Sequence, residues 1–298
     1  MSMESLQAAA DPAPFVTSTS ATNALPLVAP VPFARRLREV LTRTQHPHLG
    51  YFESANDGLA QALDKHVARC ARMFSPDSLV LVPECGLGGA VHQLATLGHR
   101  AVGIDRDPAT IALARARATS PRARFLASSM TDFAERARGA RVDVLLLNEV
   151  LAQHADLRAV LLLARALLRP GGLVLVNEVV RHPAILPTNP ARHALGAVRA
   201  AADACGFDLV ETRDISNRTA PTLPRLLRLL AERRSDLAQS LGSTPEGAAE
   251  LARSEQRLRA DELAFTRQEL FYESTALRLG ARFAHDSVVL RTSTKKSS

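Results

Sequence analysis

Between residues 79 and 179 the sequence alternates short apolar runs with stretches of helical periodicity, and this alternation restricts the fold more than any other feature. The apolar runs cover residues 79–83, 101–104, 124–127, 142–147 and 173–179. The helical stretches lie near residues 89–97, 108–118, 131–138 and 155–168. Strands that are apolar throughout are covered on both faces, and their alternation with helices is typical of a parallel sheet. The sequence therefore predicts a doubly wound α/β fold.

Helical periodicity also flanks this region. Apolar residues at helical spacing predict helices over residues 34–43, 59–74 and 190–205, and a sixth strand over 207–215. The tail predicts helices over 222–239 and 245–279, with Gly280 as the residue that ends the second of them, and a last strand over 283–291. Residues 1–33, rich in Ala, Pro, Ser and Thr, predict a disordered arm.

Composition excludes several classes of protein. The formal charge is +7, but 34 of the 37 basic residues are arginines, a bias that GC-rich coding explains without a nucleic-acid partner. Three cysteines without a CxxC pair exclude a disulfide framework and a cysteine zinc site, and they fit a cytoplasmic location. No apolar run reaches the roughly 18 residues that a membrane-spanning helix needs. The sequence offers no HxxxH or HExxH pattern, so no metal site is expected.

A glycine-rich turn follows the first predicted strand. Gly86 and Gly88 allow a ligand to approach the backbone closely, at a helix N-terminus with free N–H groups. Asp105 ends the second predicted strand, 19 residues after Gly86, where a carboxylate can accept both hydroxyls of a ribose. A dinucleotide site would need a third glycine where this chain has Val91. The pattern therefore favours a nucleoside ligand with a compact tail over a dinucleotide.

Four segments in this order resemble the class I S-adenosylmethionine (SAM) methyltransferases. They are Cys85-Gly86-Leu87-Gly88-Gly89, Gly103-Ile104-Asp105-Arg106-Asp107-Pro108, Asp143-Val144-Leu145-Leu146-Leu147-Asn148-Glu149-Val150-Leu151 and Leu168-Arg169-Pro170-Gly171-Gly172. The earlier segment His48-Leu49-Gly50-Tyr51-Phe52 is similar to small-molecule enzymes of the tocopherol, sarcosine and prenyl-diphosphate C-methyltransferase type. The resemblance implies SAM as cofactor, with S-adenosylhomocysteine (SAH) as product. It also implies a Rossmann-like, mostly parallel sheet of seven strands.

The same resemblance organises the rest of the chain. Helices after residue 221 look like the lid that such enzymes carry between strands six and seven. The expected division is an arm (1–33), an N-terminal helical segment (34–76), a SAM-binding core (77–221), a helical lid (222–280), and a last strand with the tail (281–298).

The resemblance implies a set of cofactor-binding positions, with two departures from the family pattern. Val82 replaces the usual acidic residue of the loop, so Glu84 either supplies that carboxylate to the SAM ammonium, or faces solvent or caps the helix. A third alternative is that the altered site no longer binds SAM well. Ser129 replaces an Asp near adenine, and is either a hydrogen-bonding partner or a turn residue. The full set of expected cofactor-binding residues is Glu84, Cys85, Gly86, Gly88, Asp105, Arg106, Ser129, Met130 and Asn148.

Three residues are candidates for catalysis. Glu149 follows the fourth predicted strand, where ligands of open α/β folds bind and where the resembled enzymes place a Glu in the acceptor pocket. The alternative for Glu149 is a structural role as a loop anchor. Tyr51 lies in the matched N-terminal segment, and core packing is the alternative for its ring. His154 is a candidate base or an ordinary loop histidine. Further candidates are His46, His48, His182 and Tyr272.

These features together predict SAM-dependent methyl transfer to a small, partly apolar metabolite of specialised biosynthesis. One alternative is the same fold acting as a non-methylating cyclase or binding scaffold. Another is a nucleic-acid methyltransferase, which the sequence disfavours because Asn148 is not followed by Pro-Pro-Tyr or Pro-Pro-Phe. We expect a small-molecule partner, no nucleic acid, no membrane, and a possible homo-oligomer.

Overall fold

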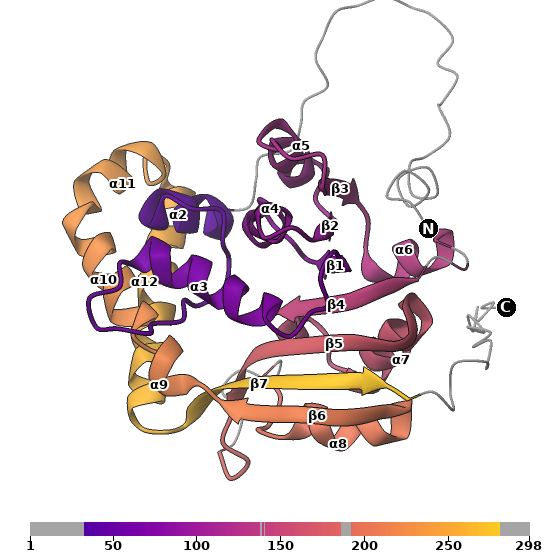
Figure 1. Ribbon diagram of the computed structural model, residues 1–298. Helices are drawn as coiled ribbons and strands as arrows, with labels where there is room; N and C mark the ends of the chain where they lie inside the picture. The colour runs from indigo at the N-terminus through magenta and orange to yellow at the C-terminus, as the bar shows by residue number, and fades with distance from the viewer. Residues whose placement is uncertain (1–32, 138, 140, 186–191, 281–298) are drawn as a thin grey trace, which may run out of the picture.

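The computed structural model describes residues 33–137, 139, 141–185 and 192–280, and in it seven strands form a single sheet. The strand order is β3-β2-β1-β4-β5-β7-β6, and β7 runs antiparallel to both of its neighbours. The strands are β1 Leu79–Pro83, β2 Arg100–Asp105, β3 Ala123–Ala127, β4 Val142–Asn148, β5 Leu168–Arg181, β6 Phe207–Asp214 and β7 Leu270–Leu279. The predicted Rossmann-like, mostly parallel sheet is therefore confirmed (Figure 1).

Helices cover both faces of the sheet because alternate strand residues point to opposite sides. Leu79 and Leu81 of β1 belong to one buried cluster, and Val80 and Val82 belong to the other. The first cluster includes α6 Met130–Arg136, α7 Leu157–Leu167 and α8 Ala197–Ala202. The second includes α3 Leu59–Ala71, α4 Gly89–Thr96 and α5 Pro108–Ala116. The core is thus doubly wound, as the apolar strands predicted.

A third cluster joins helix α2 (Phe33–Thr42) to the helices between β6 and β7, beyond the carboxyl edge of the parallel strands. Helix α2 contributes Leu37 and Leu41, which pack against leucines from the predicted lid. The helices between β6 and β7 are α9 Ser216–Thr219, α10 Thr222–Glu232, α11 Arg234–Ser240 and α12 Pro245–Thr266. In Figure 1 α2 lies against these helices on one side of the sheet.

The tail differs from the sequence prediction. Helix α12 ends at Thr266 rather than 279, and Gln268 has a left-handed backbone conformation with φ 58°. Strand β7 follows directly, between β5 and β6, so Gly280 does not end a helix. The last strand of the described sheet is therefore Leu270–Leu279, and the predicted strand over 283–291 lies outside the described residues.

Other predicted boundaries change by smaller amounts. The predicted helix over 190–205 is present as α8 and a short 3-10 turn, Asp203–Cys205, while residues 186–191 lie outside the described part. The predicted arm over 1–33 also lies outside it, except for Phe33, which begins α2. The predicted lid helices do lie between strands six and seven, but they end at Thr266.

Candidate cofactor and acceptor sites

The turn between β1 and α4 has a backbone shape that depends on its glycines. Gly86 and Gly88 adopt positive φ values of 56° and 89°, and Gly88 precedes the first residue of α4. A Cβ on Gly88 would lie 2.6 Å from the ring of Phe125, whereas a Cβ on Gly86 would meet no described atom within 4 Å. Gly88 is therefore required by packing, and the free space beside Gly86 is available to a ligand.

Asp105 lies opposite this turn at the end of β2, with only 1% of its side chain exposed. Its Oδ2 accepts a hydrogen bond from the Gly86 amide at 3.1 Å, and its Oδ1 accepts one from the Asp107 amide at 3.0 Å. Asp107 in turn caps α5 by accepting from the amides of Ala109 and Thr110. The carboxylate that is predicted to bind a ribose is thus held beside the glycine turn by two backbone amides.

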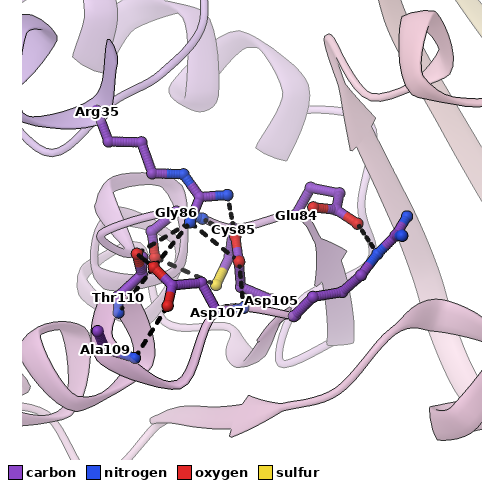
Figure 2. Close-up of polar contacts among 9 residues, drawn as sticks. Arg35, Glu84, Cys85, Gly86, Asp105, Asp107, Ala109 and Thr110 are labelled. Atoms are coloured by element: carbon purple, nitrogen blue, oxygen red, sulfur yellow. Dashed lines mark hydrogen bonds and ion pairs between the residues drawn. The ribbon is translucent and has the colours of Figure 1, made fainter. Parts of the chain in front are cut away.

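Arg35 of α2 forms a hydrogen bond and an ion pair with this carboxylate (Figure 2). The sequence alone did not single out this residue. Its Nη1 donates to Oδ1 of Asp105 at 3.0 Å, and its Nη2 lies 2.7 Å from Oδ2. Nη1 also donates to the hydroxyl of Thr110 at 3.0 Å. The N-terminal helix therefore reaches into the position where a nucleoside ribose was expected.

A cavity of about 180 Å³ lies between α2, residues 44–47 and the glycine turn. Its walls include Arg35, Arg38, His46, Gly86 and Leu87. Sites for cofactor-sized molecules usually enclose about 300–1,000 Å³. The cavity is in the expected place, but α2 closes it to less than the usual size.

Glu84, Arg106 and His154 lie together on the other side of the glycine turn. Oε1 of Glu84 lies 3.4 Å from Nε of Arg106, and the Glu84 side chain is only 11% exposed. Burial lowers the pKa of His154, and the nearby Glu84 carboxylate partly opposes that shift. Glu84 neither faces solvent nor caps α4, since that helix has no side-chain cap. A carboxylate thus lies beside the turn at a position shifted from the usual one.

Three of the remaining predicted cofactor residues have side chains with structural roles. The thiol of Cys85 is buried, its pKa is raised by burial, and it leaves no room for a Cβ on Gly103. The Ser129 hydroxyl caps α6 by accepting from the Asp132 amide at 3.0 Å, which supports the turn interpretation. The Met130 side chain is buried in the core.

Glu149 marks a second site, next to the end of β4. Its Oε1 accepts hydrogen bonds from the Leu49 amide at 2.5 Å and from the Tyr272 hydroxyl at 3.0 Å. Its own amide donates to the Asn177 carbonyl at 2.8 Å, and its φ is 54°. Burial raises the pKa of Glu149, although the positive charge of Arg38 opposes this. A carboxyl group in this state is suited to receive and release a proton.

One buried donor near Glu149, Nη1 of Arg38, has no acceptor among the described residues. The side chain of Asn148 interacts with the ring of His66, so these two groups partly satisfy each other. The oxygen of the Asn148 amide accepts from Asn177 at 2.7 Å. Burial lowers the pKa of His66 to about 3, although the interaction with Asn148 acts to raise it. A buried donor without an acceptor destabilises the folded protein, so a bound molecule that accepts a hydrogen bond from it gains affinity.

Residues 46–52, the matched N-terminal segment with two residues before it, hold Glu149 through their backbone. His48 Nδ1 contacts the Leu49 carbonyl at 2.9 Å, and because a carbonyl can only accept, Nδ1 carries the proton. His46 links His48, at 3.2 Å, to the carboxylate of Asp64, at 3.0 Å. The amide of Gly50 donates to Thr222 of α10 at 2.9 Å. The segment thus joins the surroundings of Glu149 to α10.

The structure places the second tyrosine, rather than the first, on Glu149. Tyr51 packs beside the cluster of Leu49, Leu223 and Tyr272, and the guanidinium of Arg69 lies 5.6 Å from its ring centre. Core packing is therefore what the structure shows for Tyr51. From the sequence, Tyr272 is only a further candidate, and the signal that could have raised it is its rarity, since it is one of 2 tyrosines.

Comparison with known proteins explains this arrangement. Residues 79–212 match a family described as a methyltransferase domain. The chain contains a class I methyltransferase domain. The domain begins at β1 and ends within β6, so it includes the glycine turn, Asp105 and Glu149, while Arg35, Leu49 and Tyr272 lie outside it.

The curated relatives of this methyltransferase domain match over a limited length. A ubiquinone biosynthesis O-methyltransferase of Cereibacter sphaeroides is 35% identical over 99 residues, which is 33% of this chain and 40% of that protein. The chain thus spans less than half the length of the curated relatives that it matches. The predicted membership of the class I methyltransferases is confirmed for the domain.

Solved structures extend the likeness to most of the chain. A mycolic acid cyclopropane synthase complexed with SAH has a TM-score of 0.71 at 17% identity, covering 86% of this chain and 100% of that one. The cyclase SpnF has a TM-score of 0.69 at 19% identity, covering 83% of this chain and 93% of that one. At these identities the likeness establishes the fold. No helix in the described part of the chain is long and apolar enough to cross a membrane.

Proposed function

We propose that this chain transfers a methyl group from SAM to a small, partly apolar metabolite, within specialised biosynthesis. The observation that carries the proposal is the carboxylate of Asp105, held beside the glycine turn at the carboxyl edge of a doubly wound sheet. The match of residues 79–212 to a methyltransferase domain supports it. The likeness to a cyclopropane synthase that was solved in complex with SAH also supports it.

The residues present fit the cofactor on three counts. Space beside Gly86 admits a ligand against the backbone, Asp105 can accept from ribose hydroxyls that take the place of Arg35, and Glu84 offers a carboxylate to the ammonium group. The Met130 amide and the Ser129 hydroxyl remain proposed contacts of the adenine, and Cys85, Gly88, Arg106 and Asn148 are proposed to complete the site. The cofactor supplies an electrophilic methyl group on a sulfonium.

On the acceptor side, Glu149 is proposed as the group that takes a proton from the acceptor. Burial raises its pKa, and Tyr272 and the Leu49 amide fix its Oε1. The unpaired Nη1 of Arg38 offers a donor to a polar atom of the acceptor. His154 and Tyr51 remain weaker proposals, since within the described residues no contact of theirs with Glu149 or Asp105 supports them. Orienting the acceptor contributes most of the rate in such displacements.

The proposal is tested by SAH binding. The unfolding temperature of the purified protein should rise with SAH concentration, because a ligand that binds only the folded state stabilises it. Asp105→Asn should remove most of that rise, whereas Asp208→Asn, an exposed carboxylate on β6, should keep it. Incubation with SAM and small-molecule extracts, followed by mass spectrometry, should then reveal a product heavier by one methylene group. Absence of any SAH effect would refute the proposal.

The second candidate is a non-methylating cyclase or binding scaffold on the same fold. It is favoured by the likeness to the cyclase SpnF and by the closure of the cavity to about 180 Å³. The same extracts distinguish the two functions, because a cyclase product has the mass of its substrate. Nucleic-acid methylation is disfavoured further by the lid, where arginines such as Arg253 and Arg259 pair with acidic side chains.

A further inference from the structure

The contact between Arg35 and Asp105 belongs to a helix that is anchored along its length. Glu39 of α2 forms an ion pair with Arg117, with atoms 2.6 Å apart, and the Val40 carbonyl accepts from Arg233 of the lid. Leu37 and Leu41 are buried against the lid leucines. Arg35 is therefore directed at Asp105 by a docked helix, and its side chain is only 24% exposed.

Counting hydrogen bonds shows that Asp105 has no acceptor position to spare. Oδ1 accepts from the Asp107 amide and from Nη1 of Arg35, while Oδ2 accepts from the Gly86 amide and faces Nη2 of Arg35. A carboxylate offers about four lone-pair sites, and these four donors use them. Two of the donors are backbone amides of rigid turns, so only the guanidinium can be exchanged for other donors.

We propose that Arg35 sets the affinity of the cofactor site by competing with the ribose hydroxyls for Asp105. The inference rests on the proposed function, since it assumes that a SAM-type nucleoside binds at Asp105. Two adjacent hydroxyls of a ribose can replace the two N–H donors of the guanidinium. Thr110, which already accepts from Nη1, and the nearby Asp107 can keep the displaced charge close to the site.

The competition implies that Arg35 lowers the affinity for SAH. A bidentate arginine–carboxylate pair is stronger than two neutral hydrogen bonds, and this pair lies in a mostly desolvated place. Ligand binding must break it, so the free protein is stabilised against binding. Removing the guanidinium should therefore tighten SAH binding by about tenfold, the order expected for losing one charge-assisted contact in the free state. A residue that held the ligand directly would have the opposite effect.

Titration calorimetry with SAH, at low and high ionic strength, tests this. Arg35→Gln should bind SAH about tenfold more tightly than the unchanged protein, and Arg35→Lys should fall between them because lysine cannot form the bidentate pair. Arg36→Gln is the matched control, since Arg36 is an exposed neighbour on the same helix. Salt should tighten SAH binding to the unchanged protein only slightly, since ions screen a largely buried pair much less than an exposed one.

Each outcome decides the matter. The inference is supported if Arg35→Gln binds SAH more tightly than the unchanged protein while the affinity of Arg36→Gln does not change. It is also supported if Arg35→Gln binds SAH and the unchanged protein does not. Equal or weaker binding by Arg35→Gln overturns it while the proposed function stands. If neither protein binds SAH, the proposed function itself fails. Unfolding temperatures without ligand show whether each variant is folded.

Discussion

Two carboxylates lie at the same edge of the sheet, and their surroundings differ. Asp105, at the end of β2, is held by two turn amides and by the cation of Arg35. Glu149, after β4, is held by one amide and one hydroxyl, while Arg38 stays beyond ion-pair distance and burial raises the pKa of Glu149. The first is built to accept hydrogen bonds as an anion. The raised pKa of the second fits its proposed role in proton transfer, whereas the first is proposed to bind the cofactor.

On the cofactor side, the free energy of unfolding should depend mainly on the backbone conformation of the glycine turn. Gly88→Ala should destabilise the protein by about 4 kcal/mol, because the new Cβ would meet the Phe125 ring at 2.6 Å and the residue would keep a positive φ. Gly86→Ala carries only the conformational strain, about 1 kcal/mol, since no described atom lies near its Cβ. Urea unfolding of both variants measures the difference.

The same two glycine variants distinguish an effect on folding from an effect on SAH binding. Gly86→Ala should weaken SAH binding more than it weakens folding, because its methyl group enters the space beside the turn. Equal destabilisation by the two variants would mean that the turn is not shaped as the structure describes.

On the acceptor side, the free energy of unfolding should depend on pH. Burial, and then the charge of Glu149, raise the pKa of Glu178 to about 8, well above its ordinary value of 4.5. The folded state therefore holds a proton that the unfolded state has released, and stability falls as pH rises from about 5 to 8. The expected loss over that range is about 3 kcal/mol. Glu178→Gln should remove this dependence. Because its amide nitrogen cannot accept a hydrogen bond, the new side chain cannot accept from both the Leu151 and Val179 amides, which lowers stability equally at all pH values. The decisive readout is therefore the loss of the slope.

Glu232→Gln is the control for this experiment, since it removes one negative charge from an exposed position on α10. Unfolding free energies measured from pH 5 to 9 give the slopes. A slope that persists in Glu178→Gln would assign the pH dependence to another group, and the contrast between the two sides would lose its basis.

The sequence predicted the cofactor side better than the acceptor side because its parts are local. The turn at Gly86 and the carboxylate of Asp105 belong to one strand–helix–strand unit, so their spacing alone places them together. Arg35 lies 70 residues before Asp105, in a helix outside any matched motif. Its guanidinium could be any surface arginine until the packing of α2 on the lid is known.

The acceptor side depends on contacts over much longer separations. Tyr272 reaches Glu149 across 123 residues, and Leu49 reaches it across 100. The sequence predicts a helix over 245–279, a range that includes Tyr272. Pairing with β5 and β6 determines that strand, and those partners are distant in sequence. Local propensity could not reveal this.

The smallest expected effect compares the two tyrosines. Tyr272→Phe should destabilise the protein by about 1–2 kcal/mol, because the buried Oε1 of Glu149 loses a donor and the ring volume is unchanged. Tyr51→Phe should change stability by less than about 0.5 kcal/mol, since the ring keeps its packing and its contact with Arg69. Since the Tyr272 hydroxyl stabilises the ionised carboxyl group, the gap between the variants should narrow as acid protonates Glu149. Urea unfolding at pH 5 and 8 measures both gaps. A larger effect of Tyr51→Phe would restore Tyr51 as the tyrosine that serves the acceptor side.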